Sequence, residues 1–587
     1  MQTHVPASRR WLACGVLLAI ALSHTAVQAQ SPAAFVPVTD AMLQDPSPDD
    51  WLMWRRTLDG WGYSPLDQID RDNVGDLRMV WSRALTAGMQ QGTPLVYDGV
   101  MYMPNPSDVI QAIDARTGDL RWEYRRDLPD DIDVYIRGLA DVNRNMAIHG
   151  KLIIDTSNDG YIYAVDATTG RLDWETEILD YKVNPARHSS GPIVAGGLAV
   201  SGRSCRPWGG PEACVIVAHD AATGAERWRR RLVPAPGEPG DETWGNVPYE
   251  DRVHVGAWMV PSYDPALHLI YVGTSVTSPA PKFLRGGTEN THLYHNSTLA
   301  LDADTGEIVW YYQHLNDHWD LDHPFERLLV DTAVAPDPSA VTWINPRLKS
   351  GDVRKVITGI PGKTGVVYTL DRETGEFLWA TPTVTQNVIS NIDGATGGVS
   401  TNSEVVFRRE GQEVLACPSW FGGKDWEAGA YSPMTNTMYF PLRNVCGRMM
   451  ATREAGSHYA LAVRNEIAPG TDQVGTVRAI SAETGATAWT YTQRAATMSL
   501  VATGGGLVFG GDVNGRFRAF DHKSGDVLWE INLGSAVTGF PVTFAVDDRQ
   551  YVAVSTGTAG TAAGFLSLTP ELHPSTGNTL FVFALPN

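Results

Sequence analysis

The chain has 587 residues and a formal net charge of −20. This charge excludes recognition of nucleic acid by a basic face. The 57 Gly, 36 Pro and 19 Trp residues are typical of many short strands joined by tight turns. The length allows one large all-β domain or several small ones.

The N-terminal segment is similar to a secretory signal. Arg9 and Arg10 supply the positive region, residues 11–22 form an apolar run, and Val27-Gln28-Ala29 is a small-residue cleavage site. We therefore expect residues 1–29 to be a signal peptide and residues 30–587 to form the mature chain, exported to the periplasm. The Arg pair leaves a twin-arginine signal open as an alternative. We expect no transmembrane segment, since no later stretch is apolar and long enough to span a bilayer.

Four cysteines follow the predicted cleavage site, an even number that is typical of disulfides in an oxidising compartment. Their spacing suggests the bridges Cys205–Cys214 and Cys417–Cys446, although four cysteines allow three pairings. The sequence contains no Cys-x-x-Cys-His motif and no zinc-type cysteine spacing. We therefore expect no covalent c-type haem on this chain.

One pattern, Asp-Ala-x-x-Gly-x-x-x-Trp or a near variant, occurs seven times. Each copy follows an apolar strand and has Thr-Gly or Ser-Gly at its centre, which suits a hairpin turn because Gly takes the position with φ > 0. The Trp then returns on the next strand, where it can pack between blades. The copies occupy residues 114–122, 166–174, 220–228, 302–310, 371–379, 481–489 and 521–529.

Repeats of this period predict a β-propeller. The longest interval, 110 residues between Trp379 and Trp489, can contain a blade without the motif, which brings the total to eight. Closure of the ring requires the C-terminal strand at 579–584 to pair with an early strand around Val80 and Trp81, which removes the edge strands. We therefore expect one all-β domain, an eight-bladed β-propeller with tryptophan-docking-type repeats.

Two carboxylates follow the fourth repeat, in the segment His318-Trp319-Asp320-Leu321-Asp322. In a strand-like segment, residues i and i+2 point to the same side. Asp320 and Asp322 can therefore aim at one site, one as a base and the other as a metal ligand. The alternative for an isolated Asp-x-Asp is a solvated acidic loop.

From about Trp54 to Ala584 the chain resembles the methanol/ethanol dehydrogenase family of quinoprotein alcohol dehydrogenases, which use pyrroloquinoline quinone (PQQ). The resemblance rests on the Asp320 segment, on residues 504–556, and on residues 62–69 followed by 92–96. It implies that an alcohol is oxidised with PQQ and one metal ion, Ca²⁺ or a lanthanide, and that Asp320 is the catalytic base. PQQ is a planar tricarboxylate, so its site needs cations, hydrogen-bond donors and flat groups.

The same resemblance implies a set of PQQ-binding residues. Lys363 matches a cation over the quinone oxygens, Arg144 an arginine for a PQQ carboxylate, and Trp258 a stacking tryptophan. The structural alternatives are a surface lysine, a surface salt bridge and a core tryptophan. The predicted cofactor-binding residues are Gln91, Arg144, Ser189, Ser190, Trp258, Lys363, Asp425 and Trp426.

The predicted metal ligands depart further from the family pattern. Asp322 stands where an extra carboxylate accompanies a lanthanide in some members, and hard trivalent ions favour added negative oxygens; a salt bridge to Arg327 is the alternative. The family's Asn ligand is missing, and Thr277 or Ser278 offers an oxygen in its place. Glu212 matches the family's Glu ligand three residues out of register. The predicted ligands are Glu212, Thr277, Ser278, Asp320 and Asp322.

Two further departures concern the walls of the site. Most members have two adjacent cysteines whose ring stacks on PQQ, whereas the matching stretch 133–140 has none, so we expect Tyr135 or Ile136 to cover that face. Residues 558–564 also lack the family's usual Gly-Gly-Trp. Smaller side chains there predict a roomier pocket and a bulky or secondary alcohol.

The preferred interpretation is a periplasmic PQQ-dependent alcohol dehydrogenase with a small-molecule alcohol substrate and a separate cytochrome c or other electron acceptor; a homodimer is left open. One alternative is a non-catalytic propeller that acts as a scaffold in outer-membrane assembly. Such a scaffold would not need four residues to occur together: Asp320, Lys363, Arg144 and Trp258. A second alternative is a quinoprotein sugar or polyol dehydrogenase.

Overall fold

Most of the chain forms antiparallel sheets, as the repeated motif predicts. The computed structural model describes residues 35–136, 142–205, 207–558 and 560–586, and the predicted signal peptide therefore lies outside the described residues. From Pro37 onward the chain forms one compact unit. No helix in the described ranges is long and apolar enough to cross a membrane. The α-helices of these ranges are α1 (Asp40–Gln44), α2 (Ile132–Ile136) and α3 (Gly560–Leu566).

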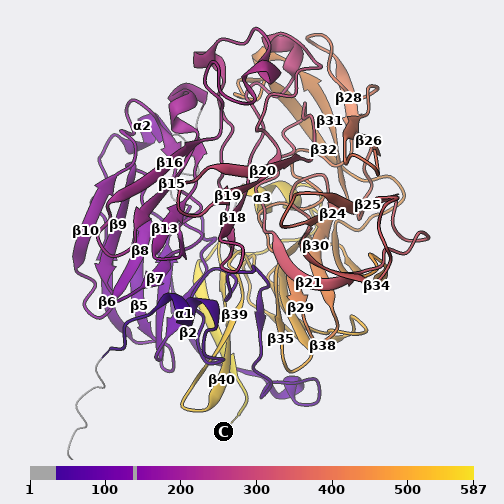
Figure 1. Cartoon of the computed structure of the whole chain (residues 1–587). Coiled ribbons are helices and arrows are strands. Elements are labelled where there is room, and N and C mark those ends of the chain that lie inside the picture. The colour runs from indigo at the N-terminus through magenta and orange to yellow at the C-terminus, as the bar shows by residue number, and fades with distance from the viewer. Residues whose placement is uncertain (1–34, 137–141, 206, 559, 587) are drawn as a thin grey trace, which may run out of the picture. The chain divides into compact units, whose positions relative to one another are not determined.

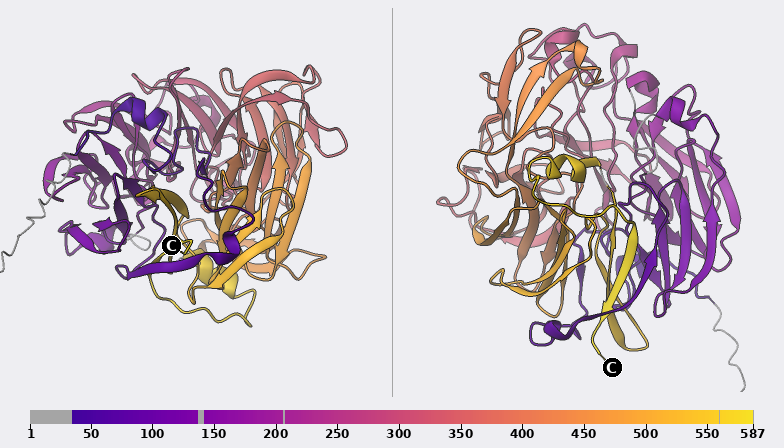
Figure 2. Two further views of the ribbon diagram at one scale, coloured as in Figure 1. Left: turned by 90° about the horizontal axis from the view of Figure 1, so that it is seen from below. Right: turned by 180° about the vertical axis from the view of Figure 1, so that it is seen from behind.

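Eight of the sheets in the described residues have four or five strands, and we call these sheets blades. Seen from below, their colour passes from purple through pink and orange to yellow around a common centre (Figure 2, left). The first four blades, labelled in part in Figure 1, are β3 (Leu95–Tyr97), β4 (Val100–Asn105), β5 (Val109–Asp114) and β6 (Leu120–Arg125); β7 (Ala147–His149), β8 (Leu152–Thr156), β9 (Tyr161–Asp166) and β10 (Leu172–Glu177); β12 (Ile193–Ala195), β13 (Leu198–Ser201), β15 (Val215–Asp220) and β16 (Glu226–Arg231); and β17 (Ser262–Asp264), β18 (Leu269–Gly273), β19 (Ser297–Asp302) and β20 (Ile308–Gln313).

The remaining blades continue the series. They are β21 (Leu328–Val334), β23 (Asp352–Gly359), β24 (Val366–Asp371), β25 (Phe377–Pro382) and β22 (Trp343–Ile344); β29 (Ala430–Ser432), β30 (Thr437–Arg443), β33 (Gly475–Ser481) and β34 (Thr487–Gln493); β1 (Tyr63–Ser64), β35 (Thr497–Thr503), β36 (Leu507–Asp512), β37 (Arg516–Asp521) and β38 (Val527–Asn532); and β2 (Arg78–Ala84), β41 (Thr579–Ala584), β40 (Arg549–Thr556) and β39 (Val542–Val546). The eight blades agree with the predicted number.

The position of a strand within its blade determines its burial. The inner strands β5 and β36 are buried at nearly every residue, because neighbouring blades cover both faces of the sheet. The outer strands β6 and β10 alternate exposed with half-buried residues, as expected for strands with one face toward solvent. The core therefore lies between blades rather than inside any one of them.

The tryptophan of each motif packs on the central glycine of the motif that comes next in the chain. The last motif has no successor and is not included. Trp228 covers Gly306, where an added Cβ would lie 2.4 Å from the indole, and its Nε1 donates to the Ala303 carbonyl at 2.8 Å. Trp122 covers Gly170 in the same manner, with Nε1 donating to Ala167 at 3.0 Å. The central glycines of all seven motifs have positive φ. The predicted turns and the packing of Trp between blades are thus confirmed.

This packing makes a glycine in the repeat sensitive to substitution. We expect Gly306→Ala to lower the free energy of unfolding by about 2–4 kcal/mol, because alanine is disfavoured at φ +67° and its Cβ overlaps the Trp228 indole. Gly351→Ala is the matched control, since Gly351 also has positive φ but has no atom within 4 Å of an added Cβ. We expect the control to cost about 1–2 kcal/mol. The free energy of unfolding is measured by denaturant titration. Equal decreases for Gly306→Ala and Gly351→Ala would contradict a role for the Trp228 contact.

The structure corrects the predicted place of the blade without the motif. The interval between Trp379 and Trp489 instead contains additional strands and the first strands of the sixth blade. The blade without the motif is the one that closes the ring, where β2 pairs with β41 and Trp81 lies opposite Val582. The predicted pairing of residues 579–584 with the segment around Trp81 is therefore confirmed. The strands outside the blades are β11 (Ala186–Arg187) with β14 (Ser204–Cys205), β26 (Ile389–Ile392) with β27 (Val399–Thr401), and β28 (Glu413–Ala416), β31 (Val445–Ala451) and β32 (Leu461–Ile467).

Candidate active site

A cavity of about 260 Å³ lies between loops that several blades contribute. Nine of the residues predicted for the cofactor, the base or the metal line it together: Gln91, Arg144, Ser189, Trp258, Asp320, Asp322, Lys363, Asp425 and Trp426. Residues more than 300 positions apart in the sequence thus share one site.

The loop after β20 presents the two carboxylates. The Asp317 carboxylate accepts hydrogen bonds from the backbone N–H groups of Trp319 and Leu321, both at 2.6 Å, and this turns the chain tightly around Asp317. Asp320 has φ +67°, a conformation that is uncommon for a residue other than Gly and is found at functional sites. The segment is therefore a turn. Asp320 and Asp322 do converge, but through this turn and not through the predicted strand-like alternation.

Lys363 stands between the two carboxylates. Its Nζ lies 3.4 Å from Asp320 Oδ1 and 3.5 Å from Asp322 Oδ2, and all three side chains are buried. Burial alone would lower the pKa of Lys363, but the Asp320 and Asp322 carboxylates outweigh it and raise this pKa well above its ordinary value. Burial raises the pKa of Asp320 well above its ordinary range, and the Lys363 ammonium opposes that shift. Lys363 thus supplies the charge that favours an ionised Asp320.

Asp322 is fixed by further donors. The Val276 N–H donates to its Oδ1 at 2.7 Å and Trp258 Nε1 donates to its Oδ2 at 3.2 Å. The predicted alternative partner, Arg327, instead donates to the backbone carbonyl of His323 at 2.7 Å. Asp322 therefore keeps its carboxylate toward the cavity, held in one orientation.

Arg144 brings a guanidinium into the cavity, and no carboxylate of the described residues lies at hydrogen-bond distance from it. It is 5% exposed and donates weakly to the Ser189 and Trp258 carbonyls at 3.3 and 3.5 Å, while its Nε has no hydrogen-bond partner within the described residues. Burial lowers its pKa to about 10. Its guanidinium lies 5.1 Å from the Trp258 ring and 5.9 Å from the Trp426 ring. A buried cation with spare donors beside two indoles fits a flat, anionic ligand.

Asp425 and Gln91 add polar groups to the same wall. Burial raises the pKa of Asp425 to about 6, while Lys363 opposes the shift. Gln91 Oε1 is buried and has no hydrogen-bond partner in the described part of the chain. An orphaned acceptor is costly unless a ligand pairs with it, so Gln91 also fits a cavity made for a polar molecule. Beneath Asp425, Lys424 and Glu326 form a buried ion pair at 2.6 Å.

Four of the predicted site residues do not line the cavity. Glu212 is on the surface, where its carboxylate accepts from the Tyr249 hydroxyl at 2.6 Å. Ser190 Oγ donates to the Gly202 carbonyl at 2.9 Å, and Ser278 Oγ donates to the His458 carbonyl at 2.5 Å. Thr277 is buried beside Val276, and its Oγ1 has no hydrogen-bond partner among the described residues. Thr277 therefore offers a buried oxygen that is unpaired within the described part of the chain.

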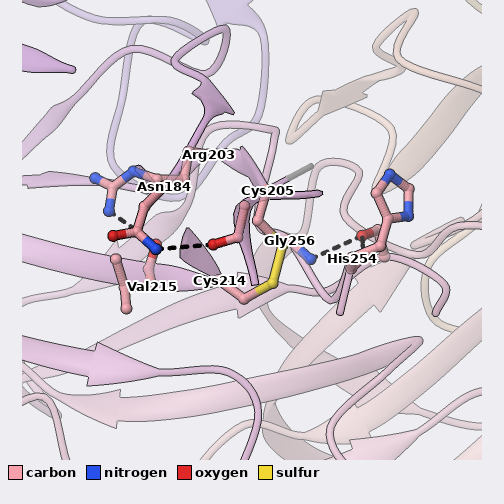
Figure 3. Close-up of a disulfide and its surroundings, with 9 residues drawn as sticks. Asn184, Arg203, Cys205, Cys214, Val215, His254 and Gly256 are labelled. Carbon is pink, nitrogen blue, oxygen red and sulfur yellow. Dashed lines mark hydrogen bonds between the residues drawn. A yellow bond between two sulfur atoms is a disulfide. The ribbon is translucent and has the colours of Figure 1, made fainter. Parts of the chain in front are cut away.

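The four cysteines form the two suggested disulfides. Cys205–Cys214 closes the loop that carries Glu212, and Cys417–Cys446 joins the segment before the cavity-lining Asp425 to β31. Figure 3 shows the Cys205–Cys214 bridge with Arg203, Gly256 and His254 around it. This loop holds Glu212 at the surface and does not bring it to the cavity.

Several residues of the cavity wall were not predicted from the sequence. Three aromatic residues and other side chains complete it: Val142, Arg187, Ser204, His254, Trp420, Phe421 and Tyr459. They lie in loops and in the short strands β11 and β14, outside the repeat spacing, and no sequence signal marks them. Neither Tyr135 nor Ile136 is among the lining residues. The ring of Tyr135 packs on Tyr181 at 5.6 Å instead.

The expectation of a roomier pocket also needs correction. Residues 560–566 form α3, and an added Cβ on Gly564 would lie 2.2 Å from the Phe421 ring. Phe421 packs edge-on against Phe565, with ring centroids 5.1 Å apart. The small residues of α3 thus admit the Phe421 side chain, which occupies part of the freed space.

Comparison with known proteins agrees with this site. The PQQ family model described as glucose/ethanol/alcohol dehydrogenase, beta-propeller domain, matches residues 51–393 and 471–552. Quinohemoprotein alcohol dehydrogenase ADH-IIG of Pseudomonas putida is 32% identical over 96% of this chain and 80% of its own length. The dehydrogenase subunit of the quinone-type alcohol dehydrogenase of Komagataeibacter europaeus is 30% identical over 95% and 78%. The structure of a europium-containing methanol dehydrogenase has a TM-score of 0.81 at 27% identity, covering 93% of this chain and 99% of that one.

The fold and the cavity define a propeller oxidoreductase with a site for a planar anionic cofactor. The chain belongs to the PQQ-dependent, or quinoprotein, alcohol dehydrogenase family. The resemblance stated from the sequence is confirmed, and the scaffold alternative is not favoured.

Proposed function

We propose that this chain is a periplasmic quinoprotein dehydrogenase that oxidises an alcohol, with Asp320 as base and a separate cytochrome c as electron acceptor. The observation that carries the proposal is the convergence of Asp320, Lys363, Arg144 and Trp258 on one buried cavity. The predicted signal peptide supports export.

Each residue has a role that follows from its surroundings. Arg144 would bind a PQQ carboxylate, and the Trp258 and Trp426 indoles would flank the ring. When bound, PQQ supplies an electrophilic carbonyl carbon that accepts hydride. Asp320 would accept the hydroxyl proton of the alcohol, while the Lys363 ammonium stabilises the two carboxylates and would offer its N–H donors to the cofactor oxygens. Burial of the site excludes water and strengthens these electrostatic contacts.

A metal ion fits the same corner. Asp320 and Asp322 offer two carboxylates, which hard cations prefer, and the unpaired Thr277 Oγ1 adjoins Asp322 through Val276. The His, Cys, Asp and Glu side chains of the described residues form no group of three or more that could hold a metal, so the ion would share ligands with other oxygens. We propose that the second carboxylate, Asp322, allows a lanthanide as well as Ca²⁺.

Reconstitution tests the proposed function. The purified protein is incubated with PQQ and either Ca²⁺ or a light lanthanide, and dye-linked oxidation is measured with primary alcohols, secondary alcohols, sugars and polyols. Turnover of alcohols that requires PQQ is the expected result. If the enzyme turns over sugars or polyols faster than simple alcohols, sugars or polyols are its substrate class instead of simple alcohols. Absence of both PQQ binding and turnover would contradict the proposal.

Asp322 should control the choice of metal. We expect Asp322→Asn to weaken lanthanide binding by at least the roughly 10- to 100-fold seen for loss of a metal-site partner, and to weaken Ca²⁺ binding less, because removal of one negative charge matters more for a trivalent ion. The measurement is titration of the PQQ-loaded protein with Tb³⁺, followed by luminescence, and with Ca²⁺ by calorimetry. Asp302→Asn, in a surface repeat turn, is the control. Equal losses for both ions would reject selectivity through Asp322.

Phe421 should limit the size of the substrate. We expect Phe421→Ala to raise kcat/KM for a bulky secondary alcohol relative to ethanol by about tenfold or more, since a few methylene-sized contacts are worth that much in an apolar pocket. The control is Phe544→Ala, because Phe544 is buried in the closing blade and should change stability without changing the ratio. An unchanged ratio in Phe421→Ala would place the substrate elsewhere in the cavity.

A further inference from the structure

An exposed apolar surface lies where α2, the loop at 180–184 and the short helix η2 (Pro207–Gly209) meet. Val134 is 63% exposed, Val183 65% and Trp208 38%. Trp208 Nε1 donates to the Tyr135 carbonyl at 2.8 Å, and the Tyr135 ring contacts Tyr181. We call these five residues the Trp208 surface. Exposed groups of apolar and aromatic side chains mark interaction sites.

A chain of aromatic rings connects this surface with the cavity. The Trp208 ring lies 6.1 Å from the His458 ring, which lies 4.0 Å from Tyr459 and 5.1 Å from His254. Tyr459 and His254 both line the cavity. The rings therefore lead from the site of alcohol oxidation to an exposed indole through successive contacts.

The border of the Trp208 surface is acidic. Asp130, Asp133 and Asp180 are exposed around it. The nearby cation Lys182 is paired with Asp131 at 2.7 Å, so this pair adds no net charge to the border. An apolar centre with an acidic border is complementary to a partner that has an apolar contact area surrounded by lysines.

We propose that the Trp208 surface docks a basic one-electron carrier protein, and that electrons leave the cavity through Tyr459, His458 and Trp208. The inference rests on the proposed function and names the place and charge of its electron acceptor. Oxidation of one alcohol to its carbonyl product releases two electrons and two protons. Two oxidised carriers each take one electron in turn, and the protons pass to solvent. Aromatic contacts serve this transfer because electron tunnelling weakens steeply with the width of the gaps.

The test compares two acceptors for the holoenzyme loaded with PQQ and its active metal. A small dye reports on alcohol oxidation alone, and a basic soluble c-type cytochrome reports on docking and electron exit. We expect Val183→Lys to lower the second-order rate with the cytochrome at least tenfold, and Trp208→Leu to lower the rate at saturating cytochrome at least tenfold. Both variants should keep the dye-linked rate within twofold. Val353→Lys, on β23 at a residue that is 76% exposed, is the matched control and should leave both rates unchanged.

Charge and binding give independent readouts. The rate with the basic cytochrome should fall as salt increases, and an acidic c-type cytochrome should react at least tenfold more slowly. Calorimetric titration with the oxidised basic cytochrome should detect binding that Val183→Lys weakens. If Val183→Lys and Trp208→Leu match the control in both cytochrome assays and binding, the docking proposal is overturned. If the unmodified holoenzyme shows no dye-linked activity, the proposed function is rejected. The calorimetric titration would still decide whether the Trp208 surface binds the carrier.

Discussion

Asp320→Asn should lower kcat by about 100- to 10,000-fold, the range that a positioned general base contributes. Asn has nearly the shape of Asp and can still accept a hydrogen bond from Lys363, which lies 3.4 Å from Asp320 Oδ1. It cannot accept the hydroxyl proton of the alcohol. The loss should therefore fall on turnover more than on PQQ binding, and steady-state dye-linked kinetics measure it.

Two comparisons separate a catalytic role from a structural one. The variant should retain PQQ, measured by absorbance after gel filtration, and a thermal unfolding midpoint close to that of the unmodified protein. Asp304→Asn, in an exposed repeat turn, should leave kcat unchanged. If kcat of Asp320→Asn stays within fivefold of that of the unmodified enzyme, another group of the cavity must act as the base.

Arg144→Met should weaken PQQ binding by about 30-fold to more than 1,000-fold. Truncating one partner of a buried, charge-assisted contact costs about 2–5 kcal/mol, and each 1.4 kcal/mol is a factor of ten in Kd. The Arg144 Nε without a hydrogen-bond partner in the described structure shows that the guanidinium has capacity for such a ligand. Quenching of protein tryptophan fluorescence on titration with PQQ measures the change.

The matched control for this charge is Arg126→Met. Arg126 is also largely buried, but it is paired with Asp159 at 2.9 Å outside the cavity, so its loss should affect stability and leave the Kd for PQQ unchanged. Arg144→Lys should give an intermediate Kd, because lysine keeps the charge without the planar fork. An unchanged Kd in Arg144→Met would show that PQQ carboxylates bind elsewhere.

The fold was largely predictable because each repeat contains its own turn and its own contact with the next blade. Gly306 and Trp228 illustrate this, since a Gly with positive φ and an indole placed on it are both visible as spacing. The position of the blade without the motif was not predictable. A long interval between motifs reveals only that residues are present, and the strands between Trp379 and Trp489 form extra sheets outside the ring.

The site divides along similar lines. Asp320 follows the regular strand β20, and Lys363 precedes the regular strand β24. Their positions relative to the blades could therefore be inferred. The position of Glu212 depends on the path of an irregular loop, which places its carboxylate at the surface. Phe421 and Tyr459 come from loops whose side-chain directions depend on tertiary packing and not on local pattern. Aromatic walls of this kind become visible only in three dimensions.

The closing blade has a consequence for how the molecule assembles. Its strand β2 comes from the beginning of the folded region and pairs with β41 near the end, whereas the other blades consist almost entirely of neighbouring hairpins. Local hairpins form early, and contacts between distant segments form late because chain entropy opposes them. During folding, seven blades can therefore acquire structure while the ring stays open. The pairing of β2 with β41 closes the ring last. Until it forms, both free strand edges can pair with other chains.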